Sequence, residues 1–432
     1  MRIAVVGSGI SGLLAANLLA SEHEVSLLES APTLGGHTCT LDVDIDGTNY
    51  PVDTGFMVFN ERTYPNFCKL LDKLEIESQP TDMSFGVKCE RTGLEYEGSL
   101  GGLFAQLHNL LSVPHYCMIA DILRFNREAP QLLTSPEKLE HRSLGEIVRE
   151  RSYSRRFIDQ YLIPMGAAIW SARPEKMLDF PALFILRFFH NHGLLQVLDR
   201  PVWRTIPGGA RRYIAKLITP LAEVRTSTPV TSISREAGSV YLTTPLGVER
   251  FDHVVLASHA DQSLAMLSDA DQQERRLLSA FPYQPNEVVI HTDTAILPRA
   301  RRAWASWNYL TPKEGNGNVA VTYDLTRLQN VRAPRPILAT LNFTHSVEPS
   351  KRIQVLQFSH PVFGPESLGA QAAWKTINGP RNTWFCGAYW RNGFHEDGVV
   401  SALQVAREFG KDLDSCRVVS TKEGFSTAAS AL

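Results

Sequence analysis

The chain has 432 residues, of which 44% are hydrophobic and 20% are charged, and its formal net charge is −2. This composition is typical of a folded protein that is long enough for two domains. The near-neutral charge excludes the basic surface of a nucleic-acid-binding protein, so we expect no nucleic-acid partner.

The cysteines and the apolar runs further narrow the class of protein and its expected location. None of the six cysteines belongs to a Cys-x-x-Cys pair, so the sequence predicts no disulfide framework and no bound metal. No run approaches the roughly 18 apolar residues that a membrane-spanning helix needs. We therefore expect a cytoplasmic protein, with peripheral membrane association as the alternative.

The first elements of the chain predict a βαβ unit. Residues 3–6 and 24–28 are short apolar runs typical of buried parallel strands, and residues 13–20 favour a helix between them. The second strand closes on an acidic residue, Glu29, followed by Ser30. Between the first strand and the helix lies a GxGxxG turn, formed by Gly7, Ser8, Gly9, Ile10, Ser11 and Gly12.

This spacing is the dinucleotide-binding fingerprint. Gly7 permits the tight turn, Gly9 lets the backbone approach a pyrophosphate, and Gly12 lets helix and strand pack closely. The helix N-terminus offers unpaired N–H groups and a positive dipole end to the phosphates. We expect Glu29 to accept hydrogen bonds from the ribose hydroxyls of the adenosine.

In the rest of the chain, segments predicted to be helical alternate with segments predicted to be extended. A helix starts near Pro65 with an apolar face, and the residues from there to about 200 are predicted to be mostly helical and are rich in aromatics. Beyond them, the sequence predicts a helix that ends near residue 221, short strands within 223–234, 240–243 and 251–257, a mixed sheet within 281–360, a strand at 383–388 and a helix at 401–408 with Asp397 as its N-cap.

Two segments resemble the FAD-binding amine oxidase and phytoene desaturase superfamily. Gly35 and Gly36 resemble its Leu-Gly-Gly-Arg turn, with His37 in place of the arginine. Residues 383–400 resemble its closing strand, glycine-containing loop and helix. The resemblance implies an α/β fold with a Rossmann-type FAD-binding domain, non-covalent FAD, and a helix N-terminus at Gly398 and Val399 that stabilises the charge of reduced flavin.

The resemblance also implies the FAD-binding residues and the domain division. Besides the fingerprint, the implied cofactor contacts are Ser30, Gly35, Gly36, His37, Gly55, Phe56, Met57, Val230, Ala257, Gly387, Asp397, Gly398 and Val399. The FAD-binding domain is expected at 1–65, 205–275 and 370–410, a mixed-sheet and helical substrate domain at 66–204 and 276–369, and a flexible tail at 411–432.

A narrower resemblance covers roughly residues 1–410. Residues 55–60 (GFMVFN), 161–171 (YLIPMGAAIWS) and 393–398 (GFHEDG) are similar to the amino-terminal flavin domain of plant cyclopropane fatty acid synthases. They are also similar to bacterial stand-alone amine-oxidase-like proteins that are typically encoded beside fatty-acid methyltransferases. This resemblance implies an acyl-lipid substrate and a cyclopropane-fatty-acid-synthase-like methyltransferase as a partner.

Three groups of side chains are candidates for chemistry or recognition. Tyr389, His395 and Glu396 are the catalytic candidates, the last two as acid or base, with holding the loop and cofactor as their alternative role. The run 180–189 with Leu194, Leu195, Val197 and Leu198 is expected to line an acyl tunnel or to pack as core. The cluster of Arg299, Arg301, Arg302, Trp304 and Trp307 is either a solvated loop or a contact for lipid headgroups.

Together these features predict an FAD-dependent oxidoreductase that moves a hydride between the flavin and an acyl-lipid carbon. Three alternatives stay open at this point: a redox-neutral double-bond isomerase, a non-catalytic flavoprotein partner of the methyltransferase, and an amine oxidase.

Overall fold

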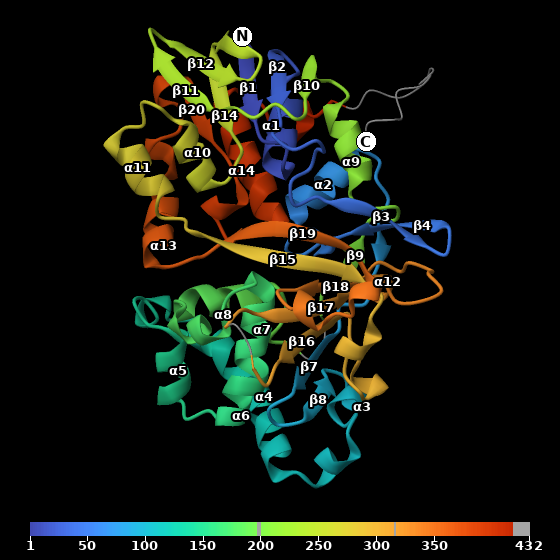
Figure 1. The fold of residues 1–432 in the computed structure, drawn as a ribbon. Helices are drawn as coiled ribbons and strands as arrows, with labels where there is room; N and C mark the ends of the chain where they lie inside the picture. The colour runs from blue at the N-terminus through green and yellow to red at the C-terminus, as the bar shows by residue number, and fades with distance from the viewer. Residues whose placement is uncertain (197–199, 315–316, 418–432) are drawn as a thin grey trace.

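The computed structural model describes residues 1–196, 200–314 and 317–417. The chain forms two stacked parts, as Figure 1 shows. The part that contains the N-terminus is built on a parallel sheet, and the other part combines a mixed sheet with helices. Among the described residues, no helix is both long and apolar enough to cross a bilayer.

The parallel sheet has five strands with β1 (Arg2–Val6) at its centre. Residues 3–6 and 25–28 are all buried, because both faces of the sheet are covered. The order of the strands is β10 (Glu223–Arg225), β2 (Glu24–Leu28), β1, β14 (His253–Leu256) and β20 (Thr383–Phe385).

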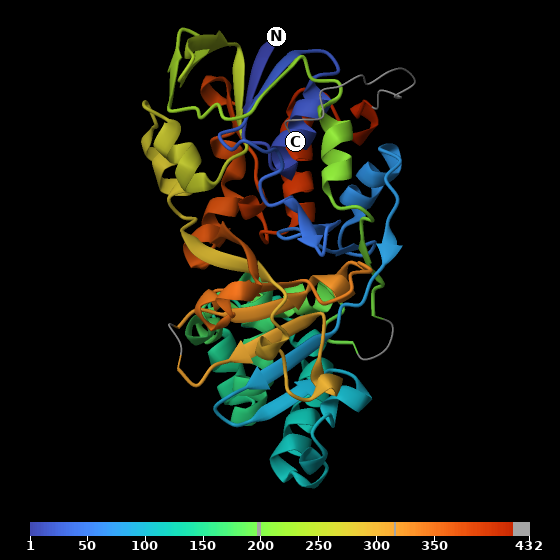
Figure 2. The ribbon, with the colours of Figure 1, turned by 45° about the vertical axis from the view of Figure 1, so that its right-hand side comes forward.

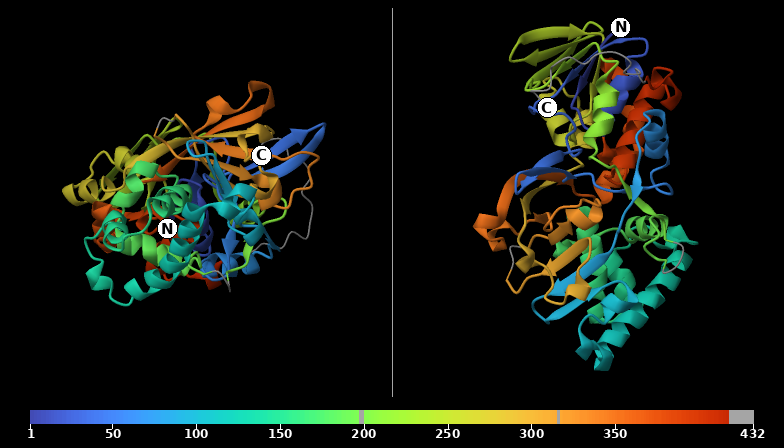
Figure 3. Two further views of the ribbon diagram at one scale, coloured as in Figure 1. Left: turned by 90° about the horizontal axis from the view of Figure 1, so that it is seen from below. Right: turned by 90° about the vertical axis from the view of Figure 1, so that its right-hand side faces the viewer.

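Two layers cover this sheet. Helix α1 (Ile10–Leu19) packs against α14 (His395–Glu408) and α9 (Arg211–Ile218), and α14 also contacts α2 (Pro65–Lys73). All ten residues of α1 are buried as a result. Figure 3 shows a small antiparallel sheet on the other side, formed by β11 (Ser232–Glu236), β12 (Ser239–Thr244) and β13 (Gly247–Phe251).

The second part contains a seven-stranded sheet that is antiparallel except where β16 pairs with β7. Its strands are β19 (Arg352–Pro361), β15 (Tyr283–His291), β18 (Leu338–Leu341), β17 (Ala320–Asp324), β16 (Trp307–Thr311), β7 (Phe85–Cys89) and β8 (Leu94–Glu97). Figure 2 shows helices beside this sheet: α4 (Val113–Leu132), α5 (Leu144–Glu150), α6 (Arg155–Phe157), α7 (Ile163–Trp170) and α8 (Ala182–Asn191).

Short elements complete the chain. The hairpin of β3 (Thr40–Ile45) and β4 (Thr48–Asp53) and the small sheet of β5 (Phe59–Asn60), β9 (Trp203–Thr205) and β6 (Gln79–Pro80) lie where the two parts meet (Figure 1). The remaining helices are α3 (Leu100–Leu103), α10 (Ala260–Met266), α11 (Gln272–Leu278), α12 (Leu325–Leu328) and α13 (Pro365–Ala372).

The structure confirms the predicted βαβ unit and the mixed sheet within 281–360. It also confirms the amphipathic helix after residue 63, since α2 buries Phe67, Leu70 and Leu71. The region that follows is mostly helical, as expected, but it also contains the strands β6, β7 and β8, which were not predicted. These strands are short and extend sheets whose other strands are distant in sequence, so no local pattern marks them.

Two expectations near the end of the chain are corrected. Helix α14 begins at His395 rather than near residue 401, and Asp397 lies in its first turn, where the carboxylate accepts the Phe394 N–H at 2.9 Å. Residues 411–417 are also not a loose start of a tail, since Lys411 and Leu413 are buried. Residues 418–432 lie outside the described residues.

Candidate functional site

The three glycines of the fingerprint have three different surroundings. Gly7 adopts φ +101°, a conformation that glycine reaches without strain, and makes the turn after β1. A Cβ on Gly12 would collide with the carbonyl oxygen of Gly7, so the helix and the strand pack at backbone contact. A Cβ on Gly9 would meet no atom within 4 Å. The middle glycine thus faces open space, as the approach of a pyrophosphate requires.

Ser8 and Glu29 connect the loops around this space. The Ser8 N–H and hydroxyl both donate to Oε2 of Glu29, at 2.9 and 2.6 Å. The Ser8 Oγ accepts the Gly35 N–H at 3.0 Å. The other carboxylate oxygen accepts the Ala31 N–H at 2.8 Å and the Ser30 hydroxyl at 3.2 Å. Glu29 therefore joins the glycine turn to the loop between β2 and β3, in addition to the ribose contact expected from the sequence.

A second wall is formed by the loop that carries Gly35, Gly36 and His37. Gly36 is exposed, and a Cβ there would lie 3.4 Å from the Cα of Gly9. The Phe56 N–H donates to the carbonyl of His37 at 2.8 Å, and a Cβ on Gly55 would collide with that same oxygen. The sequence segments around residues 9, 36 and 56 thus meet at one place.

The open space suits a dinucleotide. No side chain caps the N-terminus of α1, so its first amides are available to the phosphates. Thirteen buried side-chain polar atoms of the described residues have no hydrogen-bond partner, and Nε2 of His37 and the hydroxyl of Tyr389 are two of them. Buried polar groups are seldom left unpaired, so both atoms are candidates for contacts with a bound group. The residues present therefore fit FAD.

His37 lies within a group of rings. Its ring centroid is 5.1 Å from that of Phe358, 5.2 Å from His360 and 6.0 Å from His259. Burial and the neighbouring histidines hold the pKa of His37 well below its usual range. The residue that replaces the family's arginine is therefore neutral at pH 7, and the helix N-terminus supplies the positive potential for the phosphates.

Ala257 and Val230 lie at the edges of this site. Ala257 follows β14, and a Cβ on Gly7 would lie 3.0 Å from its carbonyl oxygen, so this residue closes off the glycine turn. Val230 is buried in the segment between β10 and β11. The Met57 carbonyl accepts the Thr205 hydroxyl at 3.0 Å, which joins the second wall to β9. Their contacts with FAD stay predictions.

Tyr389 packs its ring against Gly387, where a Cβ would collide with it. The tyrosine is 3% exposed, and burial raises the pKa of its hydroxyl well above the usual range. Its ring centroid lies 5.0 Å from that of Phe281. A neutral, unpaired hydroxyl at this place can donate or accept one hydrogen bond to a bound group.

His395 is enclosed by aromatic rings. Its ring stacks on Phe56 with a centroid distance of 3.6 Å and an interplanar angle of 8°. Its Nε2 is 2.9 Å from the hydroxyl of Tyr213, which in turn is 2.7 Å from the hydroxyl of Thr38. Burial lowers the pKa of His395 to about 3. The imidazole is thus neutral and positions Phe56, and a catalytic role for it stays a prediction.

Glu396 caps another helix. Its Oε1 accepts the Asn66 N–H at 3.0 Å and the Asn66 side-chain amide at 2.7 Å, and its Oε2 accepts the Phe67 N–H at 2.9 Å. These hydrogen bonds hold the N-terminus of α2 against α14. The carboxylate therefore holds these two helices together, and a catalytic role for it stays a prediction.

The expected position of Gly398 and Val399 is corrected. They lie in the second turn of α14 rather than at its N-terminus, and Val399 is 0% exposed. A Cβ on Gly398 would lie 2.8 Å from Cγ2 of Ile10, and the Ser11 hydroxyl donates to the Gly398 carbonyl at 3.0 Å. This glycine therefore allows α14 to pack on the start of α1.

An aromatic cluster extends from α14 into the helical part. We define it as Trp170, Phe184, Phe188, Phe363 and Phe394. Ring centroids are 4.7 Å apart between Trp170 and Phe188, 4.8 Å between Phe188 and Phe394, and 5.7 Å between Phe184 and Phe363. Phe184 and Phe394 are partly exposed. The predicted tunnel residues Val197 and Leu198 lie outside the described residues.

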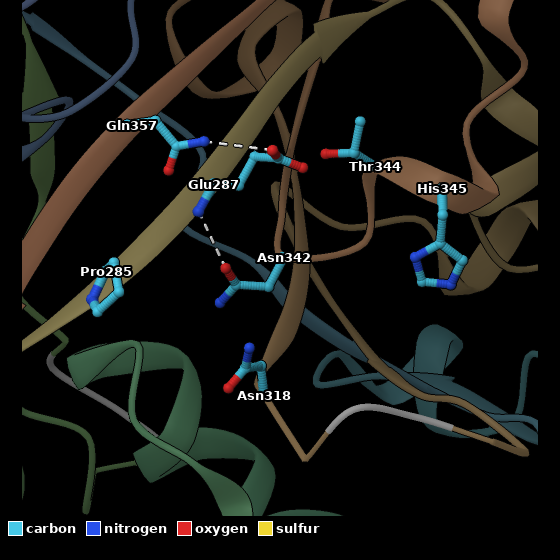
Figure 4. Close-up of a pocket in the computed structure, with 7 residues that line it drawn as sticks. All are labelled: Pro285, Glu287, Asn318, Asn342, Thr344, His345 and Gln357. Atoms are coloured by element: carbon cyan, nitrogen blue, oxygen red, sulfur yellow. Dashed lines mark hydrogen bonds between the residues drawn. The ribbon is translucent and has the colours of Figure 1, made fainter.

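Two surface hollows occur away from the glycine loops. One, of about 340 Å³, lies beside β15, β19 and the segment that follows β18, and it is lined mainly by polar side chains, as Figure 4 shows. There, Oδ1 of Asn342 accepts the Glu287 N–H at 3.0 Å. The other, of about 420 Å³, lies between α2 and the end of α14 and has a charged lining. Neither is the long apolar cavity expected for an acyl chain, and that cavity stays a prediction.

Comparison with known proteins identifies a family whose model matches this chain. The model of the family described as flavin containing amine oxidoreductase matches residues 10–306. No curated protein matches the chain. The narrower resemblance to cyclopropane fatty acid synthases stays a prediction.

Several solved structures share the fold. A CLA-producing fatty acid isomerase from P. acnes has a TM-score of 0.68 and 17% identity, over 94% of this chain and 98% of that chain. Putrescine oxidase bound to putrescine has a TM-score of 0.67 and 13% identity, over 95% and 99%. Cyclohexylamine oxidase from Brevibacterium oxydans IH-35A has a TM-score of 0.66 and 16% identity, over 95% and 99%. These similarities confirm the fold class predicted from the sequence.

Replacing Gly9 with leucine should abolish FAD binding without unfolding the protein. The new side chain meets no protein atom at its Cβ and enters the space expected for the diphosphate. Flavin absorbance of the purified protein measures occupancy, and a melting curve monitors the fold. Gly369→Leu is the matched control, since Gly369 is exposed and also has nothing within 4 Å of its Cβ position. Full flavin occupancy in Gly9→Leu would show that the cofactor lies elsewhere.

Glu29→Ala should weaken FAD binding by about ten- to hundredfold, because hydrogen bonds to a charged group contribute about 1.5–3 kcal/mol each. Titration of the apoprotein, followed by flavin fluorescence, gives the dissociation constant. Glu24→Ala is the control, since this exposed glutamate begins the same strand. An unchanged dissociation constant in Glu29→Ala contradicts the role given to this carboxylate.

The flavin should leave the protein on acid precipitation, because no activated thiol is placed to bond to it. Cys386 is fully buried, and burial raises the pKa of its thiol to about 12. Absorbance of the supernatant and of the redissolved pellet locates the flavin. Yellow colour that stays in the pellet would indicate a covalent bond, with His37 as the first residue to test.

Proposed function

The chain belongs to the flavin containing amine oxidoreductase family and is an FAD-dependent oxidoreductase, and we propose that its substrate is a fatty acyl chain of a lipid, either unsaturated, methylated or cyclopropane-modified. When bound, FAD supplies a hydride acceptor or donor. The observation that carries the substrate class is the aromatic cluster, which reaches α14 at Phe394, the residue before His395.

The aromatic cluster offers an apolar surface beside the expected flavin site. Burial lowers the pKa of His192, which stacks on Phe188 at 3.7 Å, to about 4, so this histidine adds no charge at neutral pH. The rings of Phe184 and Phe394 remain partly exposed. Apolar surface that remains accessible next to a reaction centre favours an apolar ligand, because binding removes that surface from water.

The residues of the chain then have separate tasks. The first turn of α1 binds the phosphates, and Glu29 and Ser8 orient the loops that surround them. The contacts of His395 with Phe56 and of Glu396 with Asn66 keep the C-terminal segment against the second wall. The neutral histidines leave the region without added positive charge, which suits transfer of a hydride to or from an uncharged carbon.

Two other reactions have support from the comparisons. Double-bond isomerisation is favoured by the structural similarity to a fatty acid isomerase, and it differs from our proposal in leaving the substrate's oxidation state unchanged. Amine oxidation is favoured by the family's description and by the similarity to two amine oxidases. The proposed methyltransferase partner rests on the sequence resemblance alone.

Anaerobic mixing of the FAD-loaded protein with acyl lipids should change the flavin absorbance, whereas small primary amines should not. Mass spectrometry of the recovered lipid then separates net oxidation or reduction from isomerisation. Bleaching by amines with no response to any acyl lipid would contradict the proposed substrate class.

Phe184→Ala should raise the KM for the acyl lipid about tenfold or more while FAD stays bound, because the variant loses apolar contact area. Steady-state kinetics with one acyl lipid and one soluble electron acceptor measure this change. Phe409→Ala, at the far end of α14 and likewise partly exposed, is the matched control. Equal kinetics for Phe184→Ala and the wild-type protein would show that the aromatic cluster does not bind substrate.

A further inference from the structure

The end of the molecule farthest from the parallel sheet carries exposed apolar side chains. Residues 98–120 contain no Asp, Glu, Lys or Arg, yet they form the protruding region at α3 and the start of α4 (Figures 1 and 2). We call the exposed side chains there the apolar tip: Leu100 (85% exposed), Leu107 (70%), Leu110 (47%), Leu111 (90%), Val113 (72%) and Tyr116 (48%). Contiguous exposed apolar residues mark a surface that contacts another partner.

The tip is held in place by hydrogen bonds rather than by burial of its leucines. The Gln106 side chain accepts the Glu95 N–H at 2.9 Å and donates to the Gly93 carbonyl at 2.8 Å. The Tyr116 hydroxyl donates to the Leu110 carbonyl at 3.0 Å. The buried His115 ring bonds the Leu103 carbonyl at 2.9 Å. The leucines therefore point outward from an ordered frame.

Three arginines flank the tip. Arg299, Arg301 and Arg302 are exposed, and we call them the arginine rim. The Glu95 carboxylate, in β8, accepts the Arg299 N–H at 3.0 Å and the Ala300 N–H at 2.8 Å. The same short strand thus anchors both the tip and the rim. Within the described part of the chain, no carboxylate pairs with any of these three guanidinium groups.

We propose that the apolar tip and the arginine rim form a docking surface for the anionic face of a lipid bilayer. The leucines and Val113 would enter the boundary between headgroups and acyl chains, and the arginines would contact the phosphates. Tyr116 has the amphipathic ring that is enriched at such interfaces. The lack of acidic residues in 98–120 and the protruding shape favour a bilayer over a groove on a protein partner. This inference does not depend on the substrate proposed above.

Flotation with vesicles of equal parts phosphatidylcholine and phosphatidylglycerol tests the docking surface. The FAD-loaded protein should float with these vesicles, and the double variant Leu107→Ser, Leu111→Ser should bind at least about tenfold more weakly, because two exposed leucines no longer leave water. Arg301→Gln with Arg302→Gln should weaken binding to these vesicles but not to pure phosphatidylcholine vesicles, and added salt should reproduce this loss.

The matched control is Leu246→Ser with Val248→Ser. These residues are 75% and 65% exposed on the β12–β13 hairpin, at the opposite end of the molecule. This variant should bind vesicles as the wild-type protein does. The proposal is overturned if the wild-type protein does not float, if the tip variant floats equally well, or if the control loses binding to the same extent. It is also overturned if sedimentation shows a dimer that only the tip variant abolishes, since the tip would then contact a second copy.

Discussion

The buried carboxylate of Glu29 is the contact on which the cofactor site depends. Through Ser8 it joins the glycine turn of α1 to the loop that contains Gly35. Because hydrogen bonds to a buried charge are strong and costly to leave unmade, this one group fixes the spacing between Gly9 and the opposite loop. The open space above Gly9, and the free N-terminus of α1 beside it, follow from that spacing.

The rest of the site is assembled from residues far apart in the chain. Glu396 bonds the start of α2, and Gly398 lets α14 pack on α1. The first of these contacts engages the Glu396 carboxylate, which was a candidate acid or base. Burial keeps His37 and His395 neutral at neutral pH. The helix dipole therefore supplies the positive potential for the phosphates, and the surroundings of the expected flavin stay uncharged and aromatic.

The features that could be predicted from the sequence are those formed by residues close together along the chain. The fingerprint, Glu29 and the amphipathic face of α2 are local patterns, and each was found. Contacts across the fold were not predictable: Tyr213 bonds His395, 182 residues later, and no pattern in either segment indicates the other. Asp397 shows a mixed case, since its capping chemistry was recognised but its position in the helix was not. The apolar tip was not predicted, because the sequence alone does not show which apolar side chains of short helical segments stay exposed.

A crystal structure of the protein with FAD bound would show whether Gly9 and α1 hold the diphosphate. We expect the diphosphate to lie against Gly9 and within hydrogen-bonding distance of the first-turn amides of α1, with the buried hydroxyl of Tyr389 or Nε2 of His37 gaining a partner on the cofactor. A diphosphate bound away from α1, with both of these atoms still unpaired, would contradict this expectation.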